Sequence, residues 1–170
     1  MCGLIGLINF DGTRCDSVLL NKAAETLHHR GPDDSGYWNK EGCGLAHTRL
    51  SIHDLSDAGH QPMLSSDGRY VCVFNGEIYN FEDIRKQLQD KHIKWRGHSD
   101  TEVLIEAWIH WGIDLLDRID GMFAFAIWDS KIRRLVVARD RIGEKPLYYH
   151  SSQNKFCFST YTTNSLFLHY

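Results

Sequence analysis

The second residue of this chain is a cysteine with the potential to act as a nucleophile. Cys2 precedes Gly3 and an apolar run, and aminopeptidases remove an initiator methionine when the next side chain is this small. The processed chain would begin with a thiol and an α-amine on one residue, and such an amine titrates near pH ~8. Enzymes with an N-terminal nucleophile use this pairing of nucleophile and base. Position alone, however, favours a simpler interpretation in which Cys2 only precedes a buried strand.

Two further motifs carry charges suited to the ends of an amino acid. Arg49 lies in the apolar segment 46–52, AHTRLSI, where it must reach solvent or meet a carboxylate. It either forms a structural ion pair or holds a substrate carboxylate through two parallel hydrogen bonds. Asp100 is the second residue of a capping box, Ser99 to Glu102. It either stabilises a helix N-terminus or binds a substrate ammonium.

The pair Asn75-Gly76 has two competing interpretations. Asn-Gly between apolar runs is a strong signal for a type I′ hairpin turn. The segment from Phe81 onward is better suited to a helix than to a second strand, and an Asn carboxamide beside a glycine N–H would make an oxyanion hole. The segment 30–36, RGPDDSG, is interpreted mainly as a helix stop followed by a turn.

These groups together suggest a class of substrate. A thiol, an oxyanion hole and sites for a carboxylate and an ammonium fit an α-amino acid with a reactive side-chain carbonyl. Glutamine meets that description, although the residue types alone leave it as one option among several.

The elements that must position these residues are mostly strands, with helices in two blocks. Periodicity predicts strands at 3–9, 42–51, 70–74, 122–128, 134–138, 147–150 and 155–159. It predicts helices from 16 or 17 to 29, from Asn80 onward, at 99–111 and at 113–118. This order favours an α+β fold of antiparallel sheets with helices packed outside.

Composition indicates one globular domain and excludes several classes of function. The chain has 170 residues, 42% of them hydrophobic, and a net charge of -3. It has no basic stripe for nucleic acid, no apolar stretch that could span a membrane and no signal peptide. Five scattered cysteines without CxxC spacing argue against a disulfide scaffold or a metal site and favour the cytoplasm.

Seven motifs along the chain identify a family. In order they are MCGLIGL, RGPDDSG, AHTRLSI, NGEIYNF, SDTEV, GMFAFAIWD and ARDRIGEKPLYY, from Met1 to about Phe158. The chain resembles the glutaminase domain of the asparagine synthetase (glutamine-hydrolysing) family, a class II glutamine amidotransferase. Related domains of glucosamine-phosphate synthase and the purine amidotransferase share the Cys start, but RGPDDSG with RLSI, NGEIYN and RIGEKPLYY is most similar to the synthetase branch.

The resemblance implies a fold, a substrate and residue roles. The fold would be the N-terminal nucleophile (Ntn) αββα sandwich, two antiparallel sheets between helical layers, here expected to lack its last elements. Cys2, freed of Met1, would attack the amide of L-glutamine, and Asn75 and Gly76 would stabilise the oxyanion. The other residues expected to bind glutamine are Arg49 at the α-carboxylate, Asp100 and Glu77 at the α-ammonium, and Leu50, Ser51 and Ile52 along the pocket.

The end of the chain departs from the family pattern. Family members continue into an SEIKAL-like segment and an ATP-binding synthetase domain with an SGGxDS loop, and neither is present here. We therefore expect a glutaminase domain at 1–160 and a divergent tail at 161–170, with ATP and Mg²⁺ needed only by the missing synthetase domain.

Three functional interpretations remain open from the sequence. The chain is a glutaminase domain whose synthetase partner is missing or supplied by another chain. Alternatively, it is an inactive fragment or a regulatory module. The third option is the glutaminase part of another class II amidotransferase with a different ammonia acceptor.

Overall fold

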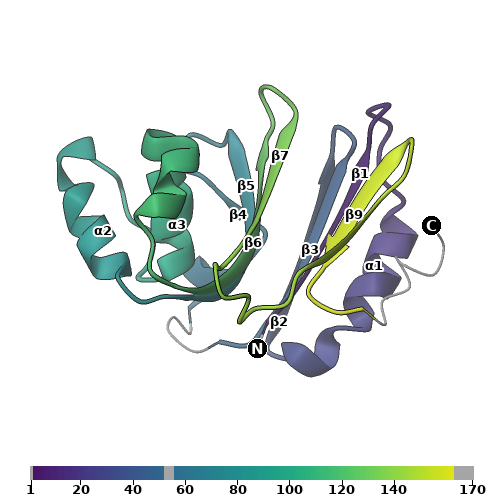
Figure 1. Ribbon diagram of the computed structural model, residues 1–170, viewed down its shortest axis with the longest axis horizontal. Coiled ribbons are helices and arrows are strands. Elements are labelled where there is room, and N and C mark those ends of the chain that lie inside the picture. The colour runs from purple at the N-terminus through teal and green to yellow at the C-terminus, as the bar shows by residue number, and fades with distance from the viewer. Residues whose placement is uncertain (1, 52–55, 163–170) are drawn as a thin grey trace.

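A computed structural model describes residues 2–51 and 56–162 as two antiparallel sheets that face each other, with helices on their outer sides (Figure 1). The first sheet has the strand order β2-β3-β1-β9-β8 and the second has the order β4-β5-β6-β7. The predicted α+β sandwich is therefore confirmed. None of the helices in these residues is long and apolar enough to cross a membrane.

The first sheet is built around its N-terminal strand. Its strands are β1 (Gly3–Asn9), β2 (Asp34–Lys40), β3 (Cys43–Arg49), β8 (Tyr148–Ser151) and β9 (Lys155–Ser159). β1 pairs with both β3 and β9, and it is apolar on both faces because α1 (Ser17–Glu25) covers one face and the second sheet covers the other. Asp16 caps α1 by accepting hydrogen bonds from the N–H groups of Val18 and Leu19.

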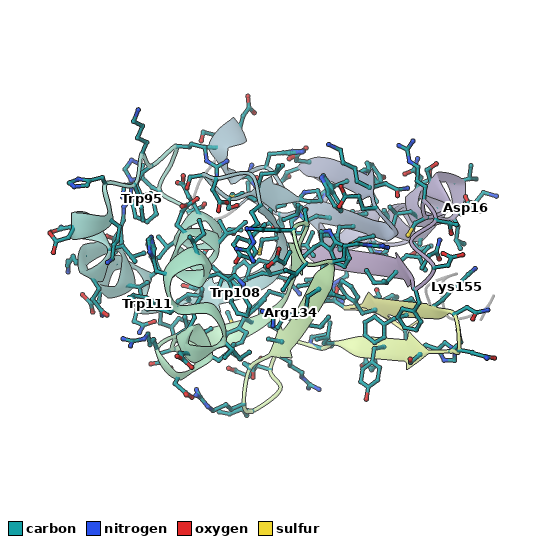
Figure 2. All side chains as sticks on the ribbon, turned by 90° about the horizontal axis from the view of Figure 1, so that it is seen from above. Asp16, Trp95, Trp108, Trp111, Arg134 and Lys155 are labelled. Carbon is teal, nitrogen blue, oxygen red and sulfur yellow. The ribbon has the colours of Figure 1, made fainter. Side chains whose placement is uncertain are left out.

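The second sheet carries the longer helices. Its strands are β4 (Met63–Leu64), β5 (Tyr70–Ile78), β6 (Gly121–Asp129) and β7 (Arg134–Arg139). Helices α2 (Phe81–Gln87) and α3 (Asp100–Trp111) lie on its outer face. Trp108 of α3 packs edge-on against Phe125 of β6, with ring centroids 6.3 Å apart. Figure 2 shows Trp95, Trp108 and Trp111 on this helical side, far from Asp16 and Lys155.

Short 3-10 segments complete the connections. They are η1 (His28–Arg30), η2 (Asp57–Gly59), η3 (Gln89–Lys91) and η4 (Gly112–Asp117). The predicted helix from 16 or 17 to 29 is thus shorter than expected, because α1 ends at Glu25 and continues only as the separate segment η1. The predicted helix at 113–118 is a 3-10 segment.

Two local turn interpretations were wrong. Asn75 and Gly76 do not form a turn: β5 runs through them to Ile78 and pairs them with Ala124 and Phe123 of β6. The RGPDDSG segment does not end in a turn either, because Asp34 begins the strand β2. Tertiary pairing overrides the local turn signal in both places.

Asn80 precedes α2 as predicted, but its side chain does not cap that helix. Its Nδ2 donates to the Arg118 carbonyl at 2.8 Å, and its Oδ1 accepts from the Asp120 N–H at 2.9 Å. The side chain therefore holds the start of α2 to the loop before β6.

Candidate active site

A cavity of about 100 Å³ collects most of the residues that the sequence singled out. Those that line it are Cys2, Arg49, Leu50, Asn75, Gly76, Glu77 and Asp100. Ser51 does not line it; its N–H donates to the Asp33 carboxylate at 2.8 Å. Ile52 lies outside the described residues, as do Met1 and residues 163–170 of the predicted tail. The first sheet contributes its β1 and β3 ends to the cavity, and the second contributes β5.

Cys2 stands just before β1 and contacts the residue that follows β3. The Leu50 N–H donates to Cys2 Sγ at 3.4 Å, and the thiol lies 3.7 Å from the Leu50 carbonyl, to which it donates. Burial raises the pKa of the Cys2 thiol, while the Leu50 hydrogen bond and the charge of Arg49 act in the opposite direction. Because little thiolate forms spontaneously near neutral pH, an attack by this sulfur requires a base.

Arg49 is the last residue of β3 and is 8% exposed. Its Nη1 donates to the Ser56 carbonyl at 3.0 Å. A Cβ on Gly59 would collide with the guanidinium, so the glycine allows the loop of η2 to pack directly against Arg49. The arginine is thus held at the cavity by the backbone of the loop that contains η2.

One edge of β5 stays open beside the cavity. β4 covers β5 only at Cys72 and Val71, so later N–H groups on that edge need other acceptors. The Phe74 N–H donates to Gln61 Oε1 at 2.7 Å, and the Ile78 N–H donates to Asp100 Oδ2 at 3.1 Å. Alternate residues of a strand direct their N–H groups to the same edge. The N–H of Gly76, midway between these two, therefore faces the cavity that Gly76 lines.

Asn75 adds a second donor at this place. Its side chain is 2% exposed, and no hydrogen-bond partner for its Nδ2 exists among residues 2–51 and 56–162. Leaving such a buried donor unsatisfied costs about 1–3 kcal/mol. An unsatisfied buried donor at a cavity is typical of a ligand-binding group. Gly76 is required beside it because a Cβ there would collide with the Met122 carbonyl of β6.

The cavity also contains charges of both signs. Asp100 and Lys145 are each 6% exposed, and Glu77 is half-buried. Asp100 begins α3, where the helix dipole favours a negative charge. The charges of Asp100 and Arg49 both act on the Cys2 thiol, so this thiol lies near a cationic and an anionic group at once. In the part of the chain that the structure describes, no three His, Cys, Asp or Glu side chains group to hold a metal ion.

Sequence reasoning missed several residues of this cavity. They are Gly59, Gln61, Phe74, Ser99, Thr101, Met122 and Lys145. Lys145 lies in the RIGEKPLYY motif. The sequence showed this motif but did not show that it brings Lys145 to the cavity. Gln61 and Thr101 carried no chemical signal, because only the pairing of distant segments brings them to the cavity.

The comparisons with known proteins agree with this geometry. The family model described as "Glutamine amidotransferase domain" matches residues 1–168. The chain belongs to this family. The resemblance found in the seven motifs is thereby confirmed.

Similar curated proteins include two asparagine synthetases of Bacillus subtilis (strain 168). Asparagine synthetase [glutamine-hydrolyzing] 3 is 38% identical over 163 residues, with 94% of this chain and 26% of that protein covered. Asparagine synthetase [glutamine-hydrolyzing] 2 is 40% identical over 172 residues, with 99% and 22% covered. Amidase chry2 of Gibberella zeae is 38% identical over 172 residues, with 94% and 26% covered. The chain thus spans about a quarter of the length of these relatives.

Solved structures confirm the fold. The glutamine phosphoribosylpyrophosphate amidotransferase of B. subtilis, solved with ADP and GMP, superposes with a TM-score of 0.78 at 19% identity, covering 94% of this chain and 42% of that one. An allosteric regulatory enzyme of purine biosynthesis gives a TM-score of 0.76 at 20% identity, with the same coverage. The Ntn sandwich expected from the motifs is therefore the fold of this chain.

Proposed function

We propose that this chain is a glutaminase domain that hydrolyses the side-chain amide of L-glutamine to glutamate and ammonia. The observation that carries the proposal is the buried Asn75 Nδ2, which has no hydrogen-bond partner among the described residues and lies beside the Gly76 N–H in the cavity that Cys2 also lines. Two donors beside a thiol are what the tetrahedral intermediate of acyl transfer needs.

The first chemical step forms a bond from Cys2 Sγ to the amide carbon of glutamine. The thiol proton passes to the α-amine of Cys2, which is free once Met1 is removed. The carbonyl oxygen becomes an oxyanion and accepts hydrogen bonds from Asn75 Nδ2 and the Gly76 N–H. The intermediate then breaks its C–N bond, the amine returns the proton to the leaving group, and ammonia departs from a Cys2 thioester. Water attacks the thioester and releases glutamate.

The same cavity contains groups that suit the α-carboxylate and the α-ammonium of glutamine. The Arg49 guanidinium suits a carboxylate because it presents parallel donors. The carboxylates of Asp100 and Glu77 suit an ammonium. The backbone of Leu50 would line the remaining side of the substrate. These roles follow from the charges in the cavity.

The ammonia would be used elsewhere. We propose that a synthetase domain or subunit takes it to form asparagine, and that ATP and Mg²⁺ act only there. The reaction would take place in the cytoplasm, because Cys2 must remain a free thiol. A different acceptor is the second candidate. Amidase chry2 matches this chain with the same 38% identity as one of the synthetases, so likeness in this domain does not specify the acceptor.

Intact-mass spectrometry before and after incubation with 6-diazo-5-oxo-L-norleucine tests the proposal. This diazoketone analogue of glutamine alkylates a nucleophile with loss of N₂. We expect a chain without Met1 that gains one adduct at Cys2, and no adduct in Cys2→Ala. Absence of an adduct on folded, Met1-free protein would support the inactive-fragment interpretation instead. Excess L-glutamine should slow labelling, which separates pocket binding from simple thiol reactivity.

A further inference from the structure

Gln61 occupies the place where β4 would continue along β5. The register of β4 pairs Met63 with Cys72, and its extension places Gln61 opposite Phe74. Pro62 between them has no N–H to donate to a ladder. The carbonyl of Gln61 turns instead toward β2, where a Cβ on Gly36 would collide with it. The backbone therefore leaves the ladder, and the Gln61 side chain accepts the Phe74 hydrogen bond at 2.7 Å in its place.

The other end of the same carboxamide reaches α3. Gln61 Nε2 donates to Thr101 Oγ1 at 3.3 Å. Thr101 lies in the first turn of α3, directly after Asp100. Gln61 and Thr101 are 5% and 4% exposed, so water does not compete for these bonds. A buried carboxamide with partners at both ends resists displacement, because moving it would leave polar groups unsatisfied.

The arrangement leaves one N–H of β5 open. Gln61 accepts from Phe74 and Asp100 accepts from Ile78, so Gly76 remains between them on the same edge. The carbonyl of Phe74 is hydrogen-bonded as well, since His47 Nε2 lies 3.0 Å from it. A longer β4 would have brought a backbone against Gly76, whereas a side-chain substitute ends before it.

We propose that Gln61 is a positioning residue for glutamine hydrolysis. Its carboxamide ties the strand that carries Asn75 and Gly76 to the α3 terminus that carries Asp100, so that the oxyanion donors and the ammonium site keep a constant separation. The inference rests on the proposed glutaminase activity. It concerns a residue that acts through its neighbours and forms no bond to the reacting atoms.

Three variants test the two hydrogen bonds of the Gln61 carboxamide separately. Gln61→Met keeps the length of the side chain and removes both hydrogen bonds, and we expect kcat to fall about tenfold to 100-fold, since a small misplacement of reacting groups has effects of this size. Gln61→Glu keeps an acceptor for the Phe74 N–H and should recover most of that loss. Thr101→Val cuts only the α3 end and should raise KM for glutamine while kcat changes by less than about threefold.

Leu115→Ala is the control for lost stability. Leu115 is fully buried in η4 and does not line the cavity, so this variant should lower the melting temperature without the kcat loss of Gln61→Met. Equal kcat values for the two variants at equal loss of melting temperature would overturn the proposal. So would a Gln61→Glu variant no more active than Gln61→Met.

Amide hydrogen exchange separates a failure of this inference from a failure of the proposed function. A wild-type chain that neither hydrolyses glutamine nor reacts with the diazoketone would refute the glutaminase activity alone. Gln61 would then be judged by exchange at residues 74–78 and at the first turn of α3. Faster exchange limited to these two segments in Gln61→Met supports the tie between them, and unchanged exchange rules it out.

Discussion

At the scale of single residues, Cys2 differs from the other four cysteines in its surroundings. Cys15, Cys43, Cys72 and Cys157 are buried in the core, whereas Cys2 is half-exposed and lines the cavity. Burial nevertheless raises the pKa of the Cys2 thiol. The thiol is therefore mostly neutral near neutral pH, and in the proposed mechanism it depends on a local base for activation.

Asn75→Ala should lower kcat for glutamine hydrolysis by about 100-fold to 1,000-fold with a much smaller change in KM. The reason is that the Asn75 Nδ2 donor serves the oxyanion, which exists only after the attack. Steady-state ammonia release would measure the effect. Asn154→Ala, an exposed position in the turn before β9, is the matched control and should retain full activity. An Asn75→Ala enzyme with normal kcat would refute the oxyanion role.

Arg49→Lys should raise KM for glutamine at least tenfold while kcat changes less. Lysine keeps the positive charge but cannot offer the two parallel donors of a guanidinium to a carboxylate. It would also lose the 3.0 Å bond to the Ser56 carbonyl. Isothermal titration with L-glutamine on a Cys2→Ala background would measure binding without turnover. The exposed Arg134→Lys is the control, and equal affinities in the two variants would contradict the carboxylate role.

At the scale of elements, the first turn of α3 is shaped by a network of caps. Ser99 Oγ accepts from the Glu102 N–H at 3.2 Å, as the capping box predicted. Glu102, by contrast, uses its carboxylate to accept from the N–H groups of Arg96 and Gly97 at 2.8 and 2.9 Å. The turn that presents Asp100 and Thr101 is thus fixed both by its own cap and by the preceding loop.

Ser99→Ala should reduce the free energy of unfolding by about 1 kcal/mol, because the Glu102 N–H would lose its acceptor at a buried helix start. Urea titration followed by circular dichroism would measure this change. Ser17→Ala is the control, since the cap of α1 is supplied by Asp16 and not by Ser17; it should stay within about 0.5 kcal/mol of wild type. Equal effects at the two serines would contradict the capping argument.

At the scale of the whole molecule, one histidine joins the two sheets. His47 of β3 is 1% exposed, and its Nε2 lies 3.0 Å from the Phe74 carbonyl of β5. Because a carbonyl oxygen only accepts, Nε2 carries the proton of this hydrogen bond. Burial lowers the pKa of His47 to about 4. Asp34, Arg49 and His60 are the charged or titratable groups that act on it.

His47 should make the fold less stable as the pH falls from about 6.5 to about 4. Above pH 6.5 the ring is neutral in both states, whereas below it only the unfolded chain takes up the proton until the folded pKa of about 4 is reached. The contribution is about 3 kcal/mol over this range. Urea midpoints against pH would measure it. His47→Gln should flatten the profile, while the exposed His60→Ala tests the Asp34 pair, and identical profiles for His47→Gln and wild type would refute the assignment.

Local sequence patterns predicted most of the helices and strands. Strands such as Gly3–Asn9 and Lys155–Ser159 match their predicted ranges because apolar periodicity is a property of neighbouring residues. The capping serine of α3 was visible for the same reason. Of the two interpretations of Asn75-Gly76 that the sequence left open, the turn was wrong. A local turn signal competes with strand pairing, and β6 supplies the stronger interaction over nine paired residues.

The sequence by itself determined the chemical inventory: a cysteine at position 2, an arginine in an apolar segment, an asparagine-glycine pair and an acidic helix start, together with the family that carries them. Residue types and short motifs are sufficient for this, because reactivity belongs to side chains. Only the tertiary structure decided that, among residues 2–51 and 56–162, β4 stops before Gly76 and the Asn75 side-chain nitrogen has no partner, and that Gln61 replaces the end of β4. These features depend on the register between segments far apart in the chain, and no local pattern encodes which edge of a strand another segment leaves uncovered.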